Sequence, residues 1–322
     1  MNIDMIRAAA HRIEGHALRT PLLRSPFLDE IAGRRLWVKP ECLQHTGSFK
    51  FRGAYAALSA LDPDLRARGV IAFSSGNHAQ GVAYAARLHG TSAVIVMPSD
   101  APALKMENTR AFGGEVVLYD RDTESREGIG ARIAVERGLT LIKPFDEPEV
   151  IAGQGTTGLE IAQDAALHGI TSADVIVCCG GGGLTSGIAL ALEADAPELR
   201  VRPAEPEGFD DVARSLSTAT RQRNTATSGS ICDAIVTPQP GDLTWPILQR
   251  LCGPGLVITE DEALSAMAQA WNRLKIVAEP GGAAALAAAL YRCDDIAGDD
   301  VIVTVSGGNV DPAMFSRALE KL

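Results

Sequence analysis

Residues 174–192 read DVIVCCGGGGLTSGIALAL, and this stretch decides the fold class. It begins with a short apolar run typical of a buried strand, continues through four glycines, and ends in an alanine- and leucine-rich run that favours a helix. We therefore expect a strand over 174–179, a glycine loop over Gly180–Gly183 and a helix that begins near Leu184. A strand that leads directly into a helix is the repeating unit of a parallel α/β sheet.

The same order of strand and helix recurs on both sides of this stretch. Apolar runs over 69–75, 92–100 and 300–308 alternate with helical segments such as the alanine-rich 77–90. These runs are continuously apolar rather than alternating, which indicates strands that are covered by helices on both faces. The sequence therefore predicts an α/β protein in which ligands bind beyond the carboxyl ends of the strands.

Composition excludes several classes of protein. The chain has 322 residues, 46% of them apolar, and a net charge of -10 with acidic and basic residues interleaved, so no basic stripe is available for nucleic acid. The amino-terminal residues lack the basic start and apolar run of a signal peptide, and we expect a cytoplasmic protein without a membrane segment. The six cysteines form no CxxC pair, which argues against disulfides and structural zinc.

The four glycines predict a phosphate site. Backbone amides between a strand and a helix can converge on an anion, and the helix dipole adds to the attraction. The stretch lacks the GK[ST] ending of a nucleotide-hydrolysing loop, and Thr185 stands where a dinucleotide fingerprint has its third glycine or alanine. Glu205, about 20 residues on, leaves a nicotinamide-dependent oxidoreductase open as an alternative, and a catalytically silent binding protein is a second one.

A lysine in an unusual setting adds to the phosphate site. Lys50 lies in the stretch HTGSFKFRGAYAA, residues 45–57, among glycines and hydroxylated residues that let a ligand approach closely. A phosphate site combined with such a lysine suggests pyridoxal phosphate, which carries one phosphate and one aldehyde that condenses with a lysine amine.

Five motifs together carry a family resemblance. In chain order they are TGSFKFRGA, SSGNHAQGVAYAA, GGGGLTSGIA, EPGGAAALAA and SGGNVD. The sequence resembles the fold-type II pyridoxal-phosphate enzymes of the serine/threonine dehydratase and serine racemase family. Within that family it resembles the 3-hydroxyaspartate dehydratase-like branch. The resemblance implies two open, mostly parallel twisted sheets with helices on both faces and the cofactor in the cleft between two domains. Residues 1–60 and 147–322 would form the large cofactor-binding domain and 61–146 a small mobile domain, in a homodimer.

The resemblance also implies roles for individual residues. Lys50 would bind the cofactor covalently and move protons at the substrate Cα, and Ser75 would act on the opposite face. The implied cofactor-binding residues are Phe49, Lys50, Asn77, Gly180, Gly181, Gly182, Gly183, Leu184 and Ser306. The implied substrate-binding residues are Ser75, Gly76, Asn77, His78 and Arg126, although His78 is equally well explained as an ordinary helix start.

Ser306 bears on the reaction. A hydroxyl beside the pyridine nitrogen cannot keep that nitrogen protonated as a carboxylate would, so the ring withdraws electrons less strongly. Such a site favours the loss of a β-substituent over transamination. We expect removal of water from a 3-hydroxy amino acid (serine, threonine or 3-hydroxyaspartate) to give a 2-oxo acid and ammonia. Because a serine at position 75 resembles racemases and their close dehydratase relatives, a serine or aspartate racemase is the alternative.

Two further expectations concern charged residues. Glu205, the carbonyl of Phe209 and Asp211 match the spacing of the family's divalent-cation site, with oxygen ligands that suit Mg²⁺, Mn²⁺ or Ca²⁺; a solvated acidic turn is the alternative. Arg126 would bring a guanidinium to the distal end of the substrate, where it could hold a second carboxylate. The alternative for Arg126 is an exposed helix arginine paired with Glu124 or Glu127.

Overall fold

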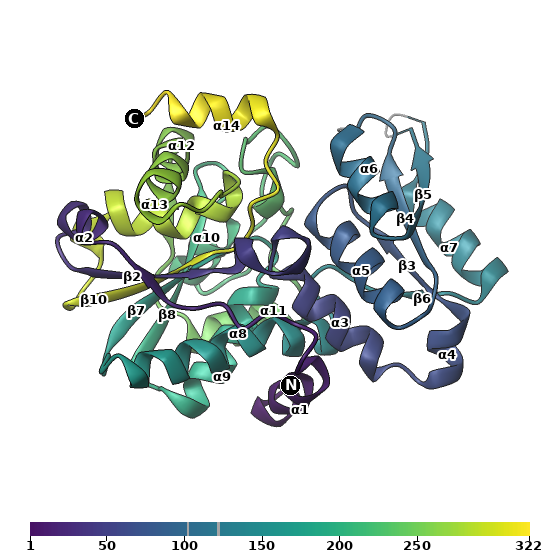
Figure 1. Cartoon of the computed structure of the whole chain (residues 1–322), viewed down its shortest axis with the longest axis horizontal. Helices are drawn as coiled ribbons and strands as arrows, with labels where there is room; N and C mark the ends of the chain where they lie inside the picture. The colour runs from purple at the N-terminus through teal and green to yellow at the C-terminus, as the bar shows by residue number, and fades with distance from the viewer. Residues whose placement is uncertain (102, 121–122) are drawn as a thin grey trace.

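Two separate sheets form the framework of the molecule (Figure 1). The structure is a computed structural model that describes residues 1–101, 103–120 and 123–322. The larger sheet has the order β1 (Leu23–Arg24), β2 (Arg35–Pro40), β10 (Asp300–Val305), β7 (Ala173–Cys178), β8 (Leu199–Pro206) and β9 (Leu256–Ile258). The smaller sheet has the order β5 (Gly114–Tyr119), β4 (Ala93–Pro98), β3 (Val70–Phe73) and β6 (Thr140–Leu141). Only β1 runs antiparallel to its neighbour among these strands, so the predicted fold class is confirmed.

Helices cover the faces of both sheets (Figure 1). The helices of the first half are α1 (Ile3–Ile13), α2 (Pro26–Ala32), α3 (Lys50–Ala60), α4 (Pro63–Arg68), α5 (Asn77–Leu88), α6 (Ala103–Ala111), α7 (Arg126–Arg137) and α8 (Pro148–Leu167). Those of the second half are α9 (Gly183–Asp195), α10 (Asp211–Thr218), α11 (Thr244–Leu251), α12 (Glu260–Gln269), α13 (Ala284–Tyr291) and α14 (Pro312–Leu319). We call residues 70–141, which carry the smaller sheet, the small lobe, and the larger sheet with its helices the large lobe.

The pattern of burial follows the position of each strand in its sheet. Every residue of β4, β7 and β10 is buried, because these inner strands have helices on both faces. The edge strand β5 exposes Glu115 and Leu118. The strand, the loop and the helix of residues 174–192 form in the predicted order. Strand β7 ends one residue before the predicted end, and α9 begins one residue before the predicted start.

Two helices of the large lobe approach each other unusually closely. A side chain at Gly187 of α9 would place its Cβ 2.6 Å from the carbonyl oxygen of Ile151 on α8, and one at Gly155 would meet the backbone of Gly187 at 2.9 Å. Glycine at these positions therefore lets the two backbones touch. This contact fixes the amino-terminal end of α9, which carries the glycine loop, against the middle of α8.

The pairing of β2 with β10 brings distant parts of the sequence together. Val38 lies opposite Val303 and Pro40 opposite Val305, so both strands end at the same edge of the sheet. Beyond that edge, Ser48 pairs with Gly307 in an isolated bridge. Residues 46–50 and 306–309 therefore lie side by side, beyond the carboxyl ends of the parallel strands.

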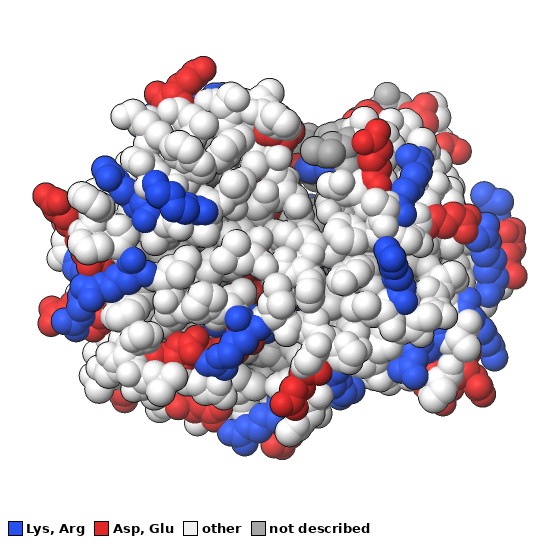
Figure 2. All heavy atoms as spheres, in the orientation of Figure 1, with Lys and Arg blue, Asp and Glu red and all other residues white. Residues whose placement is uncertain are grey.

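The surface carries mixed charge. Lysine, arginine, aspartate and glutamate side chains are interleaved over the face drawn in Figure 2. Among the described residues, no helix is both long enough and apolar enough to cross a membrane.

Candidate active site

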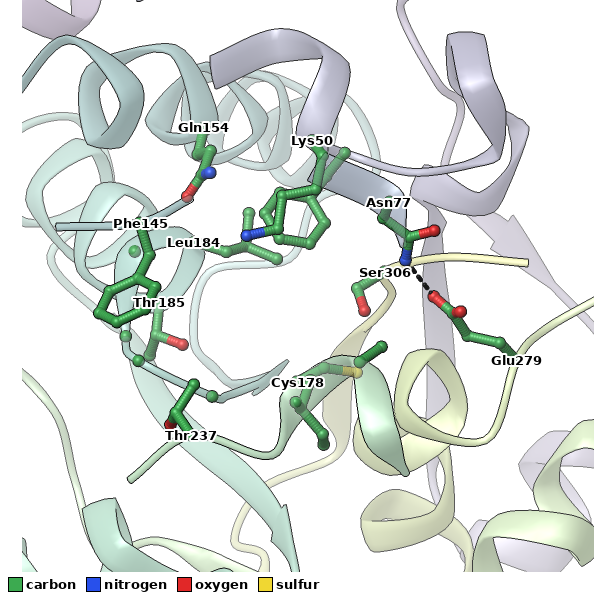
Figure 3. A pocket seen from close by; sticks show the side chains of 17 residues that line it. Lys50, Asn77, Phe145, Gln154, Cys178, Leu184, Thr185, Thr237, Glu279 and Ser306 are labelled. Atoms are coloured by element: carbon green, nitrogen blue, oxygen red, sulfur yellow. Dashed lines mark hydrogen bonds between the residues drawn. The ribbon is translucent and has the colours of Figure 1, made fainter. Parts of the chain in front are cut away.

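Lys50 is the first residue of α3, and its side chain points into a cavity between the two lobes (Figure 3). Its Nζ donates a hydrogen bond of 2.6 Å to the carbonyl oxygen of Pro144. The surrounding protein lowers the pKa of Lys50 to about 8, because burial disfavours the ammonium form, although the negative charge of Glu279 opposes this effect. The amine is therefore easier to deprotonate than an exposed lysine, as a nucleophilic lysine requires.

A buried charge network holds the helix that begins with Lys50. Arg52, which is 1% exposed, donates through Nε to Glu41 at 2.7 Å and through Nη1 to Glu160 at 2.7 Å. Glu160 also pairs with the buried Lys39 at 2.8 Å. Loss of one partner from such a network leaves an uncompensated buried charge, which typically costs about 3–5 kcal/mol. The network therefore fixes α3 against α8 and against the segment that follows β2.

The glycine loop lies at the other end of the cavity and is shaped by close contacts. Gly182 has φ 93°, a left-handed conformation that favours glycine. A Cβ on Gly181 would lie 2.2 Å from the ring of Phe145, and one on Gly180 would lie 2.9 Å from the carbonyl oxygen of Ile235. The amides that follow, at the start of α9, have no acceptor within the helix. The loop is thus a cradle of backbone donors that an anion fits.

Three buried polar side-chain atoms in the wall of this cavity lack a hydrogen-bond partner. They are Oε1 of Gln154, Oγ1 of Thr185 and Oγ1 of Thr237. Buried polar groups are nearly always hydrogen-bonded in proteins, so three orphaned atoms around one glycine loop indicate that a polar ligand completes them. The two threonine hydroxyls can donate to a phosphate, as the loop amides can.

The remaining predicted cofactor-binding residues line the same cavity. Phe49 contributes to its wall. So do Asn77, Cys178, Leu184 and Ser306 (Figure 3). Ser306 is 4% exposed, and its carbonyl oxygen accepts a 3.2 Å hydrogen bond from the amide of Phe49. The structure thus brings together Lys50, the glycine loop and Ser306, which are spread over more than 250 residues of sequence.

A second polar cluster connects the lobes. Asn77, at the start of α5, donates to a carboxylate oxygen of Glu279 at 2.5 Å and accepts from Asn309 at 2.7 Å. Glu279 is 4% exposed, and burial raises its pKa to about 7, while the hydrogen bond from Asn77 and the charges of Lys105 and Lys50 oppose that rise. Glu279 therefore changes charge in the neutral pH range.

A second cavity, of about 180 Å³, opens beside the first and shares Lys50, Asn77 and Glu279 with it. We call it the substrate cavity. The turn Ser74–Ser75–Gly76 and the start of α5, with Asn77 and His78, form one of its walls. Ser75 and Lys50 thus line the same space.

His78 belongs to the wall of the substrate cavity but is buried. Its Nε2 lies 2.9 Å from the carbonyl oxygen of Ile142. Burial, together with the charge of Lys50, lowers the pKa of His78 to about 3, so the imidazole is neutral and donates its Nε2 proton to that carbonyl. His78 therefore contributes shape to the turn rather than charge.

Arg126 lies outside both cavities. It is the first residue of α7, its side chain is 54% exposed, and its Nε donates to Glu127 at 2.7 Å. The structure thus contains the ion pair expected for an exposed helix arginine. A contact of Arg126 with a substrate stays a prediction.

The predicted cation ligands surround the start of α10. Glu205 is fully buried at the end of β8 and accepts the amides of Val212 and Ala213 at 3.0 and 2.7 Å. Asp211 is 1% exposed, and its Oδ2 has no partner among the described residues. Among the described residues, no cluster of three or more histidine, cysteine, aspartate or glutamate side chains suits a metal. The cation site of Glu205, Phe209 and Asp211 therefore stays a prediction.

Burial controls the charge of Glu205 and Asp211. Burial, reinforced by the charge of Asp211, raises the pKa of Glu205 well above its ordinary value. Burial also raises the pKa of Asp211, to about 7, although Asn224 donates a hydrogen bond to it at 2.5 Å. Carboxylate oxygens are the kind of ligand that a hard divalent cation takes, and a cation at this pair stays a prediction.

Comparison with known proteins identifies the family. A family model described as "Pyridoxal-phosphate dependent enzyme" matches residues 13–308. The chain belongs to the pyridoxal-phosphate-dependent enzymes. The family predicted from five sequence motifs is thereby confirmed, and the oxidoreductase and the silent binding protein are set aside.

Relatives of this pyridoxal-phosphate enzyme include lyases and racemases. The chain is 44% identical to an L-threo-3-hydroxyaspartate ammonia-lyase of Pseudomonas sp over 98% of either protein. It is 37% identical to an L-threonine ammonia-lyase of Thermotoga maritima, over 100% of this chain and 79% of that protein. The structure of maize serine racemase superposes with a TM-score of 0.91 at 38% identity, covering 99% of this chain and 97% of that one.

Several residues of the two cavities and of the polar cluster beside them were not assigned a role in the site from the sequence. They are Lys105, Phe145, Gln154, Cys178, Thr185, Asp233, Thr237, Glu279 and Asn309. Glu279 opens the EPGG motif and Asn309 lies in the SGGN motif, so the sequence motifs could have pointed to these two residues. Asp233 and Thr237 lie in the polar stretch 216–242, whose richness in turn-forming residues is typical of active-site loops.

Proposed function

We propose that the protein is a pyridoxal-phosphate-dependent ammonia-lyase that removes water from a 3-hydroxy amino acid and releases a 2-oxo acid and ammonia. The observation that carries the proposal is that Lys50 stands between the glycine cradle and the Ser75 turn, in two cavities that share its side chain. The similarity to an L-threo-3-hydroxyaspartate ammonia-lyase over nearly the whole chain supports it.

The residues around the cavity fit pyridoxal phosphate. The glycine cradle and the orphaned hydroxyls of Thr185 and Thr237 would hold the phosphate, and Lys50 would bind the aldehyde carbon. Asn77 would hydrogen-bond the phenolic oxygen, Phe49 would pack on the ring, and Ser306 would face the ring nitrogen. When bound, the cofactor supplies an electron-withdrawing ring that acidifies the Cα–H of an attached amino acid.

Residues of the chain itself would bind the substrate and move its proton. The backbone amides and hydroxyls of the turn 75–78 would bind the α-carboxylate and orient the substrate, and the neutral His78 would keep that turn in shape. Lys50 would take the Cα proton, since burial lowers its pKa to about 8. Because a serine at 306 leaves the ring less electron-withdrawing than a carboxylate would, departure of the 3-hydroxyl group is favoured over transamination.

Among 3-hydroxy amino acids, we propose 3-hydroxyaspartate, serine and threonine as substrates. The first is the substrate named for the Pseudomonas relative, and the third is the one named for the Thermotoga maritima relative. Racemisation of serine or aspartate on the same scaffold is a second candidate activity. It is favoured by the place of Ser75 in the wall of the cavity that Lys50 also lines, and by the similarity to maize serine racemase.

We also propose a divalent cation, Mg²⁺, Mn²⁺ or Ca²⁺, on Glu205, Asp211 and the carbonyl oxygen of Phe209. The orphaned Oδ2 of Asp211 and the raised pKa of both carboxyl groups support this site, because a cation would compensate the two buried charges.

Three broader features belong to the same proposal. Segment 61–146 would move as a unit against the rest of the chain, and the enzyme would act in the cytoplasm. The family resemblance implies a homodimer, which we also propose. Sedimentation of the purified protein tests the dimer.

A substrate panel tests the function. The purified enzyme, loaded with pyridoxal phosphate, would be given L-serine, L-threonine and L-threo-3-hydroxyaspartate, with L-alanine and L-aspartate as controls that lack a 3-hydroxyl group. We expect equal amounts of ammonia and 2-oxo acid from at least one hydroxy amino acid and none from the controls. Absence of ammonia from all three would refute the lyase, and interconversion of enantiomers alone would assign the racemase.

A further inference from the structure

An ion pair joins the two lobes at the substrate cavity. Lys105 lies on α6 of the small lobe, and Asp233 begins the short helical turn Asp233–Ile235 of the large lobe. The Nζ of Lys105 is 3.1 Å from Oδ2 of Asp233. Both residues line the substrate cavity, although they were not assigned a role above.

The pair lies on the solvent side of the cavity. The side chain of Asp233 is 63% exposed and that of Lys105 is 22% exposed, whereas Glu279, on the inner side, is 4% exposed. The lobes are therefore joined at two depths, by the Asn77–Glu279 hydrogen bond inside and by the Lys105–Asp233 pair outside. A rotation of the small lobe about the inner contact would separate the outer one first.

The Lys105–Asp233 pair also forms part of the wall between the substrate cavity and a second cavity. Lys105, Asp233 and Glu279 line both the substrate cavity and a neighbouring cavity of about 350 Å³. The neighbouring cavity contains Gln80 and Asn108 of the small lobe and Val310 and Met314 of the large lobe. Separation of Lys105 from Asp233 would remove part of the wall between the two cavities, so the position of the pair decides how open the substrate cavity is.

We propose that the Lys105–Asp233 ion pair closes the small lobe over the bound substrate, so that both are positioning residues for the ammonia-lyase reaction. The pair stabilises the closed arrangement and separates when substrate enters or product leaves. Neither side chain contacts the distal group of the substrate. This inference rests on the proposed function for its kinetic test, but the arrangement of the lobes can be measured without turnover.

Reversing the charge of Lys105 or of Asp233 distinguishes the effect of the ion pair from the effect of each charge on the pKa of Glu279. Lys105 lowers the pKa of Glu279 and Asp233 raises it. Lys105→Glu and Asp233→Lys therefore move Glu279 in opposite directions, whereas each breaks the ion pair. The double variant carries both charges in exchanged positions and restores the attraction.

The kinetic test uses the cofactor-loaded enzyme with serine, threonine and 3-hydroxyaspartate. Partly exposed ion pairs contribute little individually, so we expect each single reversal to raise KM about two- to fivefold for all three substrates, with kcat nearly unchanged. The double variant should return KM to the wild-type value. Arg110→Glu, on an exposed position of the same helix, is the matched control and should have no effect.

Hydrogen exchange provides the measurement that does not need activity. Backbone amides of residues 74–78 should exchange faster in each single variant of the loaded protein than in the wild type, and at the wild-type rate in the double variant. Failure of the substrate panel with this exchange pattern intact would refute the lyase function alone. A double variant no better than the singles, or an increase in KM confined to 3-hydroxyaspartate, would overturn the inference, the latter because Lys105 would then bind the distal carboxylate.

Discussion

The side-chain amide of Asn77 donates a hydrogen bond of 2.5 Å to the buried carboxylate of Glu279, which joins the small lobe to the large lobe at the inner end of the substrate cavity. The same carboxylate lies close enough to Lys50 to oppose the fall in the pKa of that lysine. One acidic side chain thus acts on a residue proposed to hold the cofactor's phenolic oxygen and on the lysine proposed to bind the cofactor.

Replacement of Glu279 by glutamine tests this relationship. Hydrogen bonds to charged groups contribute about 1.5–3 kcal/mol, so Glu279→Gln should weaken cofactor binding about tenfold or more. Burial raises the pKa of Glu279 to about 7, and the wild-type kcat/KM should therefore change across neutral pH. A titration of cofactor absorbance and a pH profile measure both effects. An unchanged profile in the glutamine variant would assign the neutral-pH transition to another group.

Lys50 should bind the cofactor covalently. Lys50→Ala is expected to abolish turnover and the lysine-linked chromophore, and borohydride reduction of the wild type should fix the cofactor on Lys50 in a peptide map. In the cofactor-free protein, the rate of pyridoxal phosphate attachment should rise with pH through about 8, the pKa to which burial lowers this amine. Attachment at another lysine, or a rise only near the pKa of an exposed lysine, would contradict the assignment.

Ser75 is proposed to serve the face of the substrate opposite Lys50. Ser75→Ala should remove racemisation, or reaction with one enantiomer, and preserve elimination from the enantiomer that Lys50 deprotonates. Chiral chromatography and ammonia release on each enantiomer measure the two activities separately. Equal loss of all of them would instead indicate that the hydroxyl of Ser75 binds the α-carboxylate.

The proposed cation site should be visible in the pH dependence of stability. The folded-state pKa of Asp211 is raised to about 7, and that of Glu205 is also raised, so unfolding releases protons near neutrality. Without a divalent cation, stability should fall as pH increases from about 4 to about 7, by at most about 1.4 kcal/mol per pH unit for each carboxyl group.

Added Mg²⁺ should reverse that loss. A cation that binds the two ionised carboxylates stabilises the folded state by mass action, so the melting temperature should rise with Mg²⁺ at pH 7.5 and stay constant at pH 4. Asp211→Asn should lack the response. If neither chelator nor added Mg²⁺ changes the melting temperature at pH 7.5, the two carboxyl groups form a solvated acidic turn instead of a cation site.

The prediction for Arg126 concerns substrate choice. If closure of the small lobe brings this arginine to the substrate, Arg126→Ala should reduce kcat/KM for 3-hydroxyaspartate by about 2–5 kcal/mol in transition-state free energy and leave serine and threonine nearly unaffected. Arg126→Lys should recover part of the loss. If the ion pair with Glu127 persists in the complex, all three substrates should change by less than about 1 kcal/mol.

Local patterns made the fold and the cofactor predictable. The strand, loop and helix of residues 174–192 depend on neighbours in the sequence, so their order could be read directly. Glu279 and Lys105 are different, because their importance arises from contacts between lobes. Lys105 lies in a helix of mixed charge and looks like any exposed lysine, and only the fold places it opposite Asp233. Phe145 likewise follows no pattern, and its role appears only where a Cβ on Gly181 would clash with its ring.

The central place of β10 in the larger sheet, between β2 and β7, has a consequence for biosynthesis. The chain reaches Lys50 early, but Ser306 and the strand that positions it are made about 250 residues later. At the usual rate of translation, this interval lasts roughly ten to fifty seconds. Throughout that time the nascent chain exposes the edge of β2, in the later part it also exposes the edge of β7, and it cannot complete its cofactor pocket. Ribosome-bound chains should therefore need protection by chaperones, and cofactor should be captured only after β10 and Ser306 have been made.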